Sequence, residues 1–302
     1  MSSFKAYLHL ARPQQYVKNV FVLLPVFFGH KFLELPAISQ ALGAFAAFCL
    51  AASSVYVFND LADIEEDRRH PVKKHRPLAA GILRPSEAVP FLVVLLSASI
   101  IFSLVFLPRK FLGILASYLV LNFLYSLFLK RLAIVDIACI GLSFVLRVVG
   151  GGFAANIPIS PWIILMTFLL AVFLALAKRR DDLLAAAQGN GVRKGIDGYS
   201  LEFVSQGMVV MASVVLFSYV MYTVSPEVIE KHGTRHLYLT SFWVILGILR
   251  YLQLALVEKR TGSPTAIVLT DYFMQAVIFC WVLTWLGLTY GKTEYIAFLI
   301  AG

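Results

Sequence analysis

The sequence predicts an all-α, polytopic membrane protein of about nine transmembrane helices in one bundle, on three observations. Hydrophobic residues make up 60% of the 302 residues, charged residues only 14%, and the mean hydropathy is +0.81. A soluble domain cannot bury that much apolar surface. Many apolar runs reach the length of about 18 residues that crosses a bilayer as a helix. These runs are continuous rather than alternating, which favours helices over a β-barrel.

Polar breaks and turn residues set the bounds of the expected spans. Lys18, Asn19 and Pro25 predict that the first span is kinked or only partly membrane-deep. The fifth span carries Arg147, a cation inside the bundle, and glycines at 150–152 that let backbones approach closely. No long linker divides the chain, so we expect a single domain over residues 1–302. The nine spans are expected at about 16–35, 37–59, 86–107, 110–129, 133–156, 161–180, 202–224, 237–257 and 270–290.

The distribution of cations predicts the orientation. With a cytoplasmic N-terminus, 19 of the 26 lysines and arginines fall on the cytoplasmic side and six on the other. That asymmetry follows the positive-inside rule and puts the polar segments 59–85 and 178–201 on the cytoplasmic face. The net charge of +9 is explained by this bias and by attraction to anionic membrane lipid. No basic face with a fold of its own points to nucleic acid, so we expect no nucleic-acid partner.

The stretch NDLADIEEDRRHPVKKHRP, residues 59–77, sorts its acids before its bases. If the second helix continues past Phe58, then Tyr56, Asn59 or Asp60, Asp63 and Asp67 recur at helical steps on one face. Such oxygen ligands suit Mg²⁺, which is held by one or two side chains while phosphates and water complete its shell. The cations that follow can neutralise phosphate charge. The stretch therefore predicts a metal–diphosphate site; the alternative is a solvated helix end with internal ion pairs.

The second polar segment, LAKRRDDLLAAAQGNGVRKGIDGYS, complements the first. Lys178 and Arg179 lie four and three residues before Asp182, so a helix places all three on one face. The glycines that follow make the next loop pliant enough to approach a phosphate. Snorkelling cations at a helix end are the alternative interpretation. The expectation that both segments share one face of the membrane favours the functional one.

Several motifs together resemble the UbiA superfamily of intramembrane prenyltransferases. Asn59-Asp60-x-x-Asp63-x-x-x-Asp67 matches its first signature, and Arg12-Pro13 with Lys18 and Asn19, YSLFLKRLAIVD and the nine-span layout also fit. The aromatic prenyltransferases of that superfamily carry a second Asp-rich motif, which this chain lacks after Asp182. Its AKRRDDL and GVRKG, with RPQQYVKN, HPVKKHRPLAAG and FVLRVVGGG, resemble the decaprenyl-phosphate phosphoribosyltransferase branch.

The resemblance implies a reaction. Its donor is phosphoribosyl pyrophosphate (PRPP), its acceptor is a polyprenyl phosphate, and its product is an early precursor of lipid-linked arabinofuranose for cell-envelope polysaccharide. It implies Mg²⁺ as cofactor and the bacterial inner (cytoplasmic) membrane as location, with the active site on the cytoplasmic face. A donor with a 5-phosphate as well as a diphosphate needs more cations and fewer metals than a prenyl diphosphate. The cations at 178–180 meet that need.

The candidate residues fall into groups by expected role. Asp60, Asp63 and Asp67 are the catalytic candidates, and Asn59, Asp63 and Asp67 the metal ligands. The candidates for donor phosphates are Lys18, Lys73 and Arg76, and Tyr56 is expected to donate a hydrogen bond on the metal face. The candidates for the 5-phosphate or the lipid phosphate are Lys130, Arg147, Lys178 and Arg179, with Asp182 beside them. Tyr125 and Asp136 are candidates for the ribose hydroxyls or for purely structural roles.

Two other classes of function remain open from the sequence. One is a prenyltransferase that moves an isoprenoid from its diphosphate to an aromatic or lipid acceptor; the missing second Asp cluster argues against it. The other is a transporter or lipid-binding protein, for which Arg147 and Asp136 would line the pathway. Nothing indicates inverted repeats with broken helices in matched positions. The sequence also leaves a homo-oligomer open.

The orientation gives a first testable prediction. Cysteines introduced as Lys73→Cys or Arg193→Cys should react with a membrane-impermeant thiol reagent only from the cytoplasmic side, because both loops are expected there. Labelling of intact cells against inverted membrane vesicles measures this. Labelling of either position from outside would contradict one composite site built from both segments.

Overall fold

The computed structural model describes residues 3–187, 198–258, 267 and 270–290, and in that part of the chain every regular element is helical. This confirms the all-α expectation. Eight of the described helical stretches are long and apolar enough to cross a membrane. They are α3 (Leu35–Ala62), α5 (Pro85–Phe106), α6 (Arg109–Leu127), α7 (Val135–Ala155), α8 (Pro161–Ala187), α9 (Leu201–Val224), η4 with α11 (Leu237–Leu256) and α13 (Tyr272–Tyr290).

The first expected span, 16–35, is not one continuous α-helix. After α1 (Ser3–Ala11), a 3₁₀ helix η1 covers Pro13–Leu23, and a short α2 covers Leu24–Phe28. Proline stands in the first turn of both η1 and α2, where its fixed φ starts a helix and its missing N–H costs nothing. A 3₁₀ helix rises about 2 Å per residue, so η1 and α2 together reach roughly 30 Å, the thickness of the hydrocarbon core.

Shorter elements join the long helices. They are α4 (Ile64–Arg69), η2 (Lys73–His75), η3 (Leu129–Arg131) and α10 (Pro226–His232), with η4 (Leu237–Thr240) leading directly into α11 (Ser241–Leu256). The chain separates into two compact units: residues 1–175 with 182–200, and residues 176–181 with 201–302. The expected single domain over 1–302 stays a prediction.

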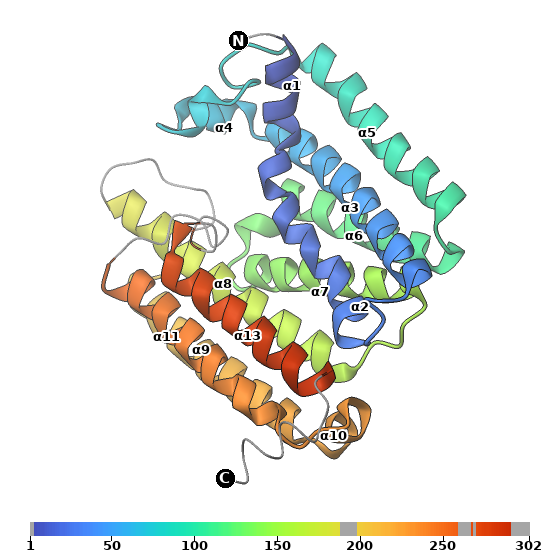
Figure 1. Ribbon diagram of the computed structural model, residues 1–302. Coiled ribbons are helices and arrows are strands. Elements are labelled where there is room, and N and C mark those ends of the chain that lie inside the picture. Colours follow the sequence, from blue (N-terminus) through green and yellow to red (C-terminus); the bar gives the residue numbers. More distant parts are fainter. Residues whose placement is uncertain (1–2, 188–197, 259–266, 268–269, 291–302) are drawn as a thin grey trace. The chain divides into compact units, whose positions relative to one another are not determined.

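In the first unit, α3 packs against α5, α6, α7 and η1, so it is the central helix of that unit (Figure 1). Small residues line much of α3, and they let its neighbours approach. The ring of Phe48 on α3 meets Phe111 and Tyr118 of α6 edge to face, with centroids 5.6 and 5.1 Å away. This apolar core positions the polar end of α3 beyond it.

In the second unit, α9, α11, η4 and α13 pack on one another. Hydrogen bonds between aromatic and hydroxyl side chains join these elements. Trp243 Nε1 donates to Thr284 Oγ1 at 2.9 Å, and Trp281 Nε1 donates to Tyr219 Oη at 2.7 Å. Arg250 Nη2 of α11 is 2.7 Å from Oδ2 of Asp271, the residue before α13. The unit is thus held together by polar contacts as well as by apolar packing.

Gly151 brings the backbone of α7 against η1, a close backbone approach of the kind that the sequence predicts for the glycines at 150–152. A Cβ added at Gly151 would lie 1.8 Å from the carbonyl oxygen of Val22, a distance no atom pair can tolerate. The two backbones therefore touch, and only glycine fits between them. This contact fixes η1 on α7 close to Arg147.

A substitution tests this contact. We expect Gly151→Ala to destabilise the protein by about 2 kcal/mol or more, because the methyl group forces α7 and η1 apart. Gly113→Ala is the matched control, since a Cβ there meets nothing within 4 Å. Thermal unfolding in one detergent at one scan rate measures both variants. Equal unfolding midpoints for the two would show that the close approach is absent.

Candidate active site

The polar end of α3 carries the first group of candidate residues. The helix ends at Ala62, Asp63 departs from helical geometry with φ −107°, and α4 begins at Ile64. Hydrogen bonds of helical spacing nevertheless continue across the break. Asp63 N donates to Asn59 O at 3.0 Å, and Asp67 N donates to Asp63 O at 2.8 Å. The chain therefore keeps the helical path that the spacing of the acids predicts.

Asn59 and Asp63 converge on one lysine. Nζ of Lys130, on η3, lies 2.6 Å from each carboxylate oxygen of Asp63 and 3.5 Å from Oδ1 of Asn59. The two side chains lie one helical turn apart, so they project from the same ridge. The Asp63 and Lys130 side chains are mostly buried, at 18% and 11% exposure. This ammonium marks a point where side-chain oxygens favour a cation.

Asp60 and Asp67 form a second group with two arginines. Nη1 of Arg76 lies 3.1 Å from Oδ1 of Asp60 and 2.6 Å from Oδ2 of Asp67. Arg12 also donates to Asp60, whose side chain is only 2% exposed. Seven residues separate the two acids, which is two helical turns. The acidic residues expected on a single helix face therefore lie on two adjacent ridges. Asn59, rather than Asp60, shares its ridge with Asp63.

Asp67 and His70, which follow the polar end of α3, have shifted pKa values. Burial raises the pKa of the Asp67 carboxyl, although Arg76 beside it acts in the opposite direction. Burial, and then the charge of Lys73, lower the pKa of His70. A neutral His70 agrees with its contacts, because its Nδ1 accepts hydrogen bonds from the backbone N–H of Val72 and Lys73 at 3.2 and 3.3 Å. The ring thereby shapes the loop that carries Lys73, a partly buried donor-phosphate candidate.

Arg147 lies inside the first unit with 4% of its surface exposed. Its three nitrogens donate to Asn19 Oδ1, Ser143 O and Tyr118 Oη at 2.8, 2.8 and 2.9 Å. The guanidinium also lies against the rings of Tyr118 and Phe144. Arg147 therefore joins η1, α6 and α7. Sequence reasoning gave it a phosphate-binding role and missed Tyr118, which no motif marks.

Asp136 has a structural arrangement of its own. It is buried, and its Oδ1 accepts hydrogen bonds from Tyr199 Oη at 2.5 Å and from the backbone N–H of Ile137 at 2.8 Å. Tyr199 in turn accepts from Ile134 N at 2.6 Å. These contacts hold the first turn of α7 against Tyr199. The sequence leaves open whether Asp136 binds ribose or has a structural role, and these contacts favour the structural role. Tyr125, the other candidate for the ribose hydroxyls, lies partly buried on α6.

The cations of the second polar segment differ in exposure. Lys178 is exposed, whereas Arg179 and Arg180 are buried. Arg180 donates to Ser205 Oγ at 3.2 Å and to the carbonyl oxygen of Ala255, which ties α8 to α9 and α11. The charge of Asp182 opposes the lowering of the His70 pKa. Residues 188–197, with most of the predicted glycine-rich loop, lie outside the described residues.

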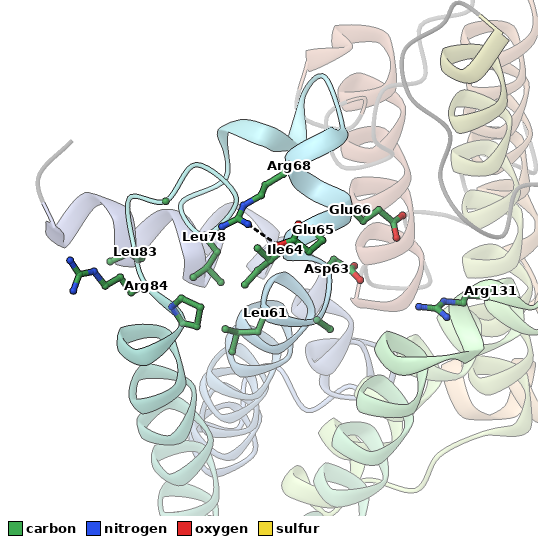
Figure 2. A pocket seen from close by; sticks show the side chains of 13 residues that line it. Leu61, Asp63, Ile64, Glu65, Glu66, Arg68, Leu78, Leu83, Arg84 and Arg131 are labelled. Atoms are coloured by element: carbon green, nitrogen blue, oxygen red, sulfur yellow. Dashed lines mark hydrogen bonds and ion pairs between the residues drawn. The ribbon is translucent and has the colours of Figure 1, made fainter.

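A cavity of about 520 Å³ adjoins Asp63 (Figure 2). Leucines and Ile64 form its apolar lining, and Glu66 and Arg131 bring charge to it. On its wall, Arg68 Nη1 pairs with Glu65 Oε1 at 2.7 Å. Arg131 follows Lys130 on η3, so this element contributes one cation to Asp63 and the next to the cavity. The acidic end of α3 is therefore reachable by a small ligand.

The side-chain oxygens at this point fit a divalent metal ion that is held chiefly by substrate. Among the described residues, no three His, Cys, Asp or Glu side chains gather closely enough to hold a metal ion by themselves. Mg²⁺ seldom requires such a cage, because one or two protein oxygens with phosphates and water suffice. Asn59 and Asp63 supply that number at the point where the Lys130 ammonium already lies. Asp67 pairs with Arg76, and its role as a metal ligand stays a prediction.

Comparisons with known proteins place the chain in a family. Residues 22–266 match the model of the UbiA prenyltransferase family. The chain is 30% identical to the decaprenyl-phosphate phosphoribosyltransferase of Mycolicibacterium smegmatis, over 90% of this chain and 88% of that protein. It is 31% identical to the protein of the same name from Mycobacterium tuberculosis, over 90% of each.

Solved structures show the same fold. A UbiA homolog from Archaeoglobus fulgidus, bound to GPP and Mg²⁺, superposes with a TM-score of 0.69 at 17% identity, over 94% of this chain and 99% of that one. Together with the eight apolar helices, these matches show a multi-pass membrane transferase. The family match extends over most of the length, and so the chain belongs to the UbiA prenyltransferase family.

Proposed function

We propose that this protein transfers 5-phosphoribose from PRPP to a polyprenyl phosphate and releases diphosphate. The observation that carries the proposal is the pairing of acids with cations at the end of α3. Lys130 contacts Asp63, and Arg76 contacts both Asp60 and Asp67. Such a site offers ligands for one metal and several cations for phosphate. The relatives named decaprenyl-phosphate phosphoribosyltransferase support this choice of donor and acceptor.

The reaction is a displacement at C1 of the ribose. The C1–O bond to diphosphate breaks, and its electron pair leaves with the diphosphate. An oxygen of the lipid phosphate attacks the opposite side and supplies the electron pair of the new bond. This nucleophile is already ionised near neutral pH, so no strong general base is needed. Positioning and charge neutralisation then supply most of the rate.

The residues of the site divide this work. Asn59 and Asp63 would hold Mg²⁺, which stabilises the negative charge that builds on the leaving diphosphate. Lys130, Lys73 and Arg76 bind the diphosphate oxygens, since Lys130 of η3 contacts Asp63 while Lys73 and Arg76 lie in the segment that follows α4. As a phosphate approaches, the ion pairs of Lys130 and Arg76 exchange a carboxylate partner for a phosphate partner.

The 5-phosphate needs a cation of its own. Lys178 is the best candidate in the second polar segment, because its side chain is exposed whereas Arg180 is buried. Arg179 is buried, so we assign it a structural role in this part of α8 rather than contact with the 5-phosphate. We place the reaction at the cytoplasmic face of a bacterial inner membrane. Its product would be a precursor of lipid-linked arabinofuranose.

One observation favours a second candidate function. The fold matches a UbiA homolog bound to GPP, a prenyl diphosphate, so a prenyl donor is the natural alternative. Against it, the segment after Asp182 carries no second acid cluster for a further metal. The two functions differ in whether the donor needs a 5-phosphate.

The metal assignment is tested by Asp63→Asn, which keeps the shape of the side chain and removes its charge. We expect at least about a hundredfold loss of diphosphate release with PRPP, because the leaving group loses its stabilised metal. Chelation with EDTA should abolish turnover of the wild type. Glu34→Gln, an exposed acid paired with Lys31, is the control and should be fully active. Near-normal activity of Asp63→Asn at saturating Mg²⁺ would refute the assignment.

The role of Lys178 is tested by Lys178→Ala with two donors. We expect the KM for PRPP to rise about tenfold, since a charge-assisted bond to phosphate contributes roughly 1.5–3 kcal/mol. The KM for the lipid phosphate should stay unchanged. Ribose 1-diphosphate, which lacks the 5-phosphate, should be a poor donor for the wild type, and the variant should hardly discriminate against it.

The matched control for this prediction is Lys231→Ala, another exposed lysine in the same unit. It should leave both KM values unchanged. If Lys178→Ala raises the KM values of PRPP and of ribose 1-diphosphate equally, Lys178 does not contact the 5-phosphate.

A further inference from the structure

The cavity beside Asp63 follows a ridge of its own on the α3–α4 segment. Leu61, Ile64 and Arg68 recur at steps of three and four residues, so they project from one side of the helical path, and all three line the cavity. Of the candidate metal and catalytic residues in 59–67, Asp63 alone borders it. The cavity is therefore separate from the pair of acids that Arg76 binds.

The floor of the cavity is apolar and well packed. Leu78 and Leu83 line it, and both belong to a buried cluster with Val57 of α3 and Ala88 of α5. Leu61 and Ile64 pack against the same cluster. The volume of about 520 Å³ is in the range of sites that bind small molecules. The cavity thus has a firm apolar base between the end of α3 and the start of α5.

Two exposed arginines lie at the ends of this apolar base. Arg84 directly precedes α5, Arg131 is the last residue of η3, and both line the cavity. Figure 2 shows them on opposite sides of the lining residues, with Leu61 and Leu78 between them. Neither guanidinium pairs with an acid in the described ranges. Each can therefore offer its paired N–H groups to a ligand.

The acids around the cavity are outnumbered. Asp63 lies 2.6 Å from Nζ of Lys130, Glu65 pairs with Arg68 at 2.7 Å, and Glu66 is the third acid of the lining. With Lys130 counted, four cations stand against these three acids. An anionic group therefore fits the cavity better than a cation does.

The two arginines also stand at the ends of membrane-spanning helices. Arg84 comes before the span Pro85–Phe106, and Arg131 follows the span Arg109–Leu127. Snorkelling alone explains a cation at the end of a span, but it does not produce a cavity with an apolar base. Both spans continue from this end with exposed apolar side chains, which are Val89 and Val93 on α5 and Leu124 and Leu127 on α6. The surroundings therefore suit a ligand with a charged head and apolar chains.

We propose that this cavity binds the headgroup of an anionic glycerophospholipid of the surrounding membrane. Arg84 and Arg131 donate paired hydrogen bonds to its phosphate oxygens, the glycerol region rests on Leu61 and Leu78, and the acyl chains run along α5 and α6. Basic pockets between spans bind such headgroups in other membrane proteins. The lipid is a bound component and not a reactant, so the inference goes beyond the proposed function and does not depend on it.

Native mass spectrometry of purified, delipidated full-length protein tests the site by titration with three lipids. Phosphatidylglycerol carries one anionic phosphodiester, cardiolipin carries two, and phosphatidylcholine has a choline charge that cancels its phosphate. We expect the wild type to bind both anionic lipids at least about tenfold more tightly than phosphatidylcholine, because the arginines bind uncompensated phosphate.

Two substitutions assign the phosphate contacts. Arg84→Gln and Arg131→Gln should each raise the Kd of cardiolipin about tenfold, and at least one of them should do the same for phosphatidylglycerol. Loss of phosphatidylglycerol affinity in one variant alone identifies the arginine that binds a single phosphate. Arg109→Gln is the matched control, since it changes an exposed arginine at the start of α6 that does not line the cavity.

Ala62→Trp separates the cavity from general surface charge. Ala62 is the exposed last residue of α3 and lines the cavity, so an indole there fills space without changing charge. We expect it to weaken binding of both anionic lipids severalfold, whereas attraction by surface charge alone would leave their Kd values unchanged. Equal Kd values for phosphatidylglycerol and phosphatidylcholine, or unchanged values in both arginine variants or in Ala62→Trp, would overturn the proposal. Displacement of phosphatidylglycerol by an equal concentration of farnesyl phosphate would also overturn it, because the cavity would then belong to the acceptor lipid.

Discussion

The candidate site depends on the neutralisation of buried carboxylates by cations from distant segments. Asp60 is almost wholly buried, and it is held by Arg12 from before η1 and Arg76 from the loop after α4. Removing one partner from a buried ion pair costs roughly 3–5 kcal/mol, because a charge is left without compensation. The stability of the acidic end of α3 therefore depends on these segments staying in place. The same cations are the groups that an incoming phosphate would attract.

Arg147 performs the corresponding task deeper in the first unit. It binds Asn19 of η1, Tyr118 of α6 and the backbone of α7, while Gly151 brings the α7 backbone onto Val22. These two contacts fix the position of η1 along the axis of α3. Because Arg12 directly precedes η1, the same contacts place its guanidinium at Asp60. A structural arginine inside the membrane thus determines charge pairing at the polar end of the bundle.

The sequence predicts the helices and the acid–base stretch because both depend on local periodicity. It also predicts the close backbone approach at 150–152, because glycine has no Cβ to hold two backbones apart. The sequence does not predict that Asn59 and Asp63 form one group and Asp60 and Asp67 another. That grouping depends on which cation from a distant segment contacts each pair. The 3₁₀ form of η1 is likewise invisible to a hydropathy pattern, and so is Tyr118, which resembles any aromatic residue of a span.

We propose that this protein uses a phosphoribosyl donor rather than a prenyl donor. The most direct measurement offers the purified protein PRPP or farnesyl diphosphate, each with Mg²⁺ and a polyprenyl phosphate, and follows diphosphate release together with the mass of the lipid product. We expect release from PRPP alone, with the lipid gaining one 5-phosphoribosyl group. Release from farnesyl diphosphate with none from PRPP would contradict it.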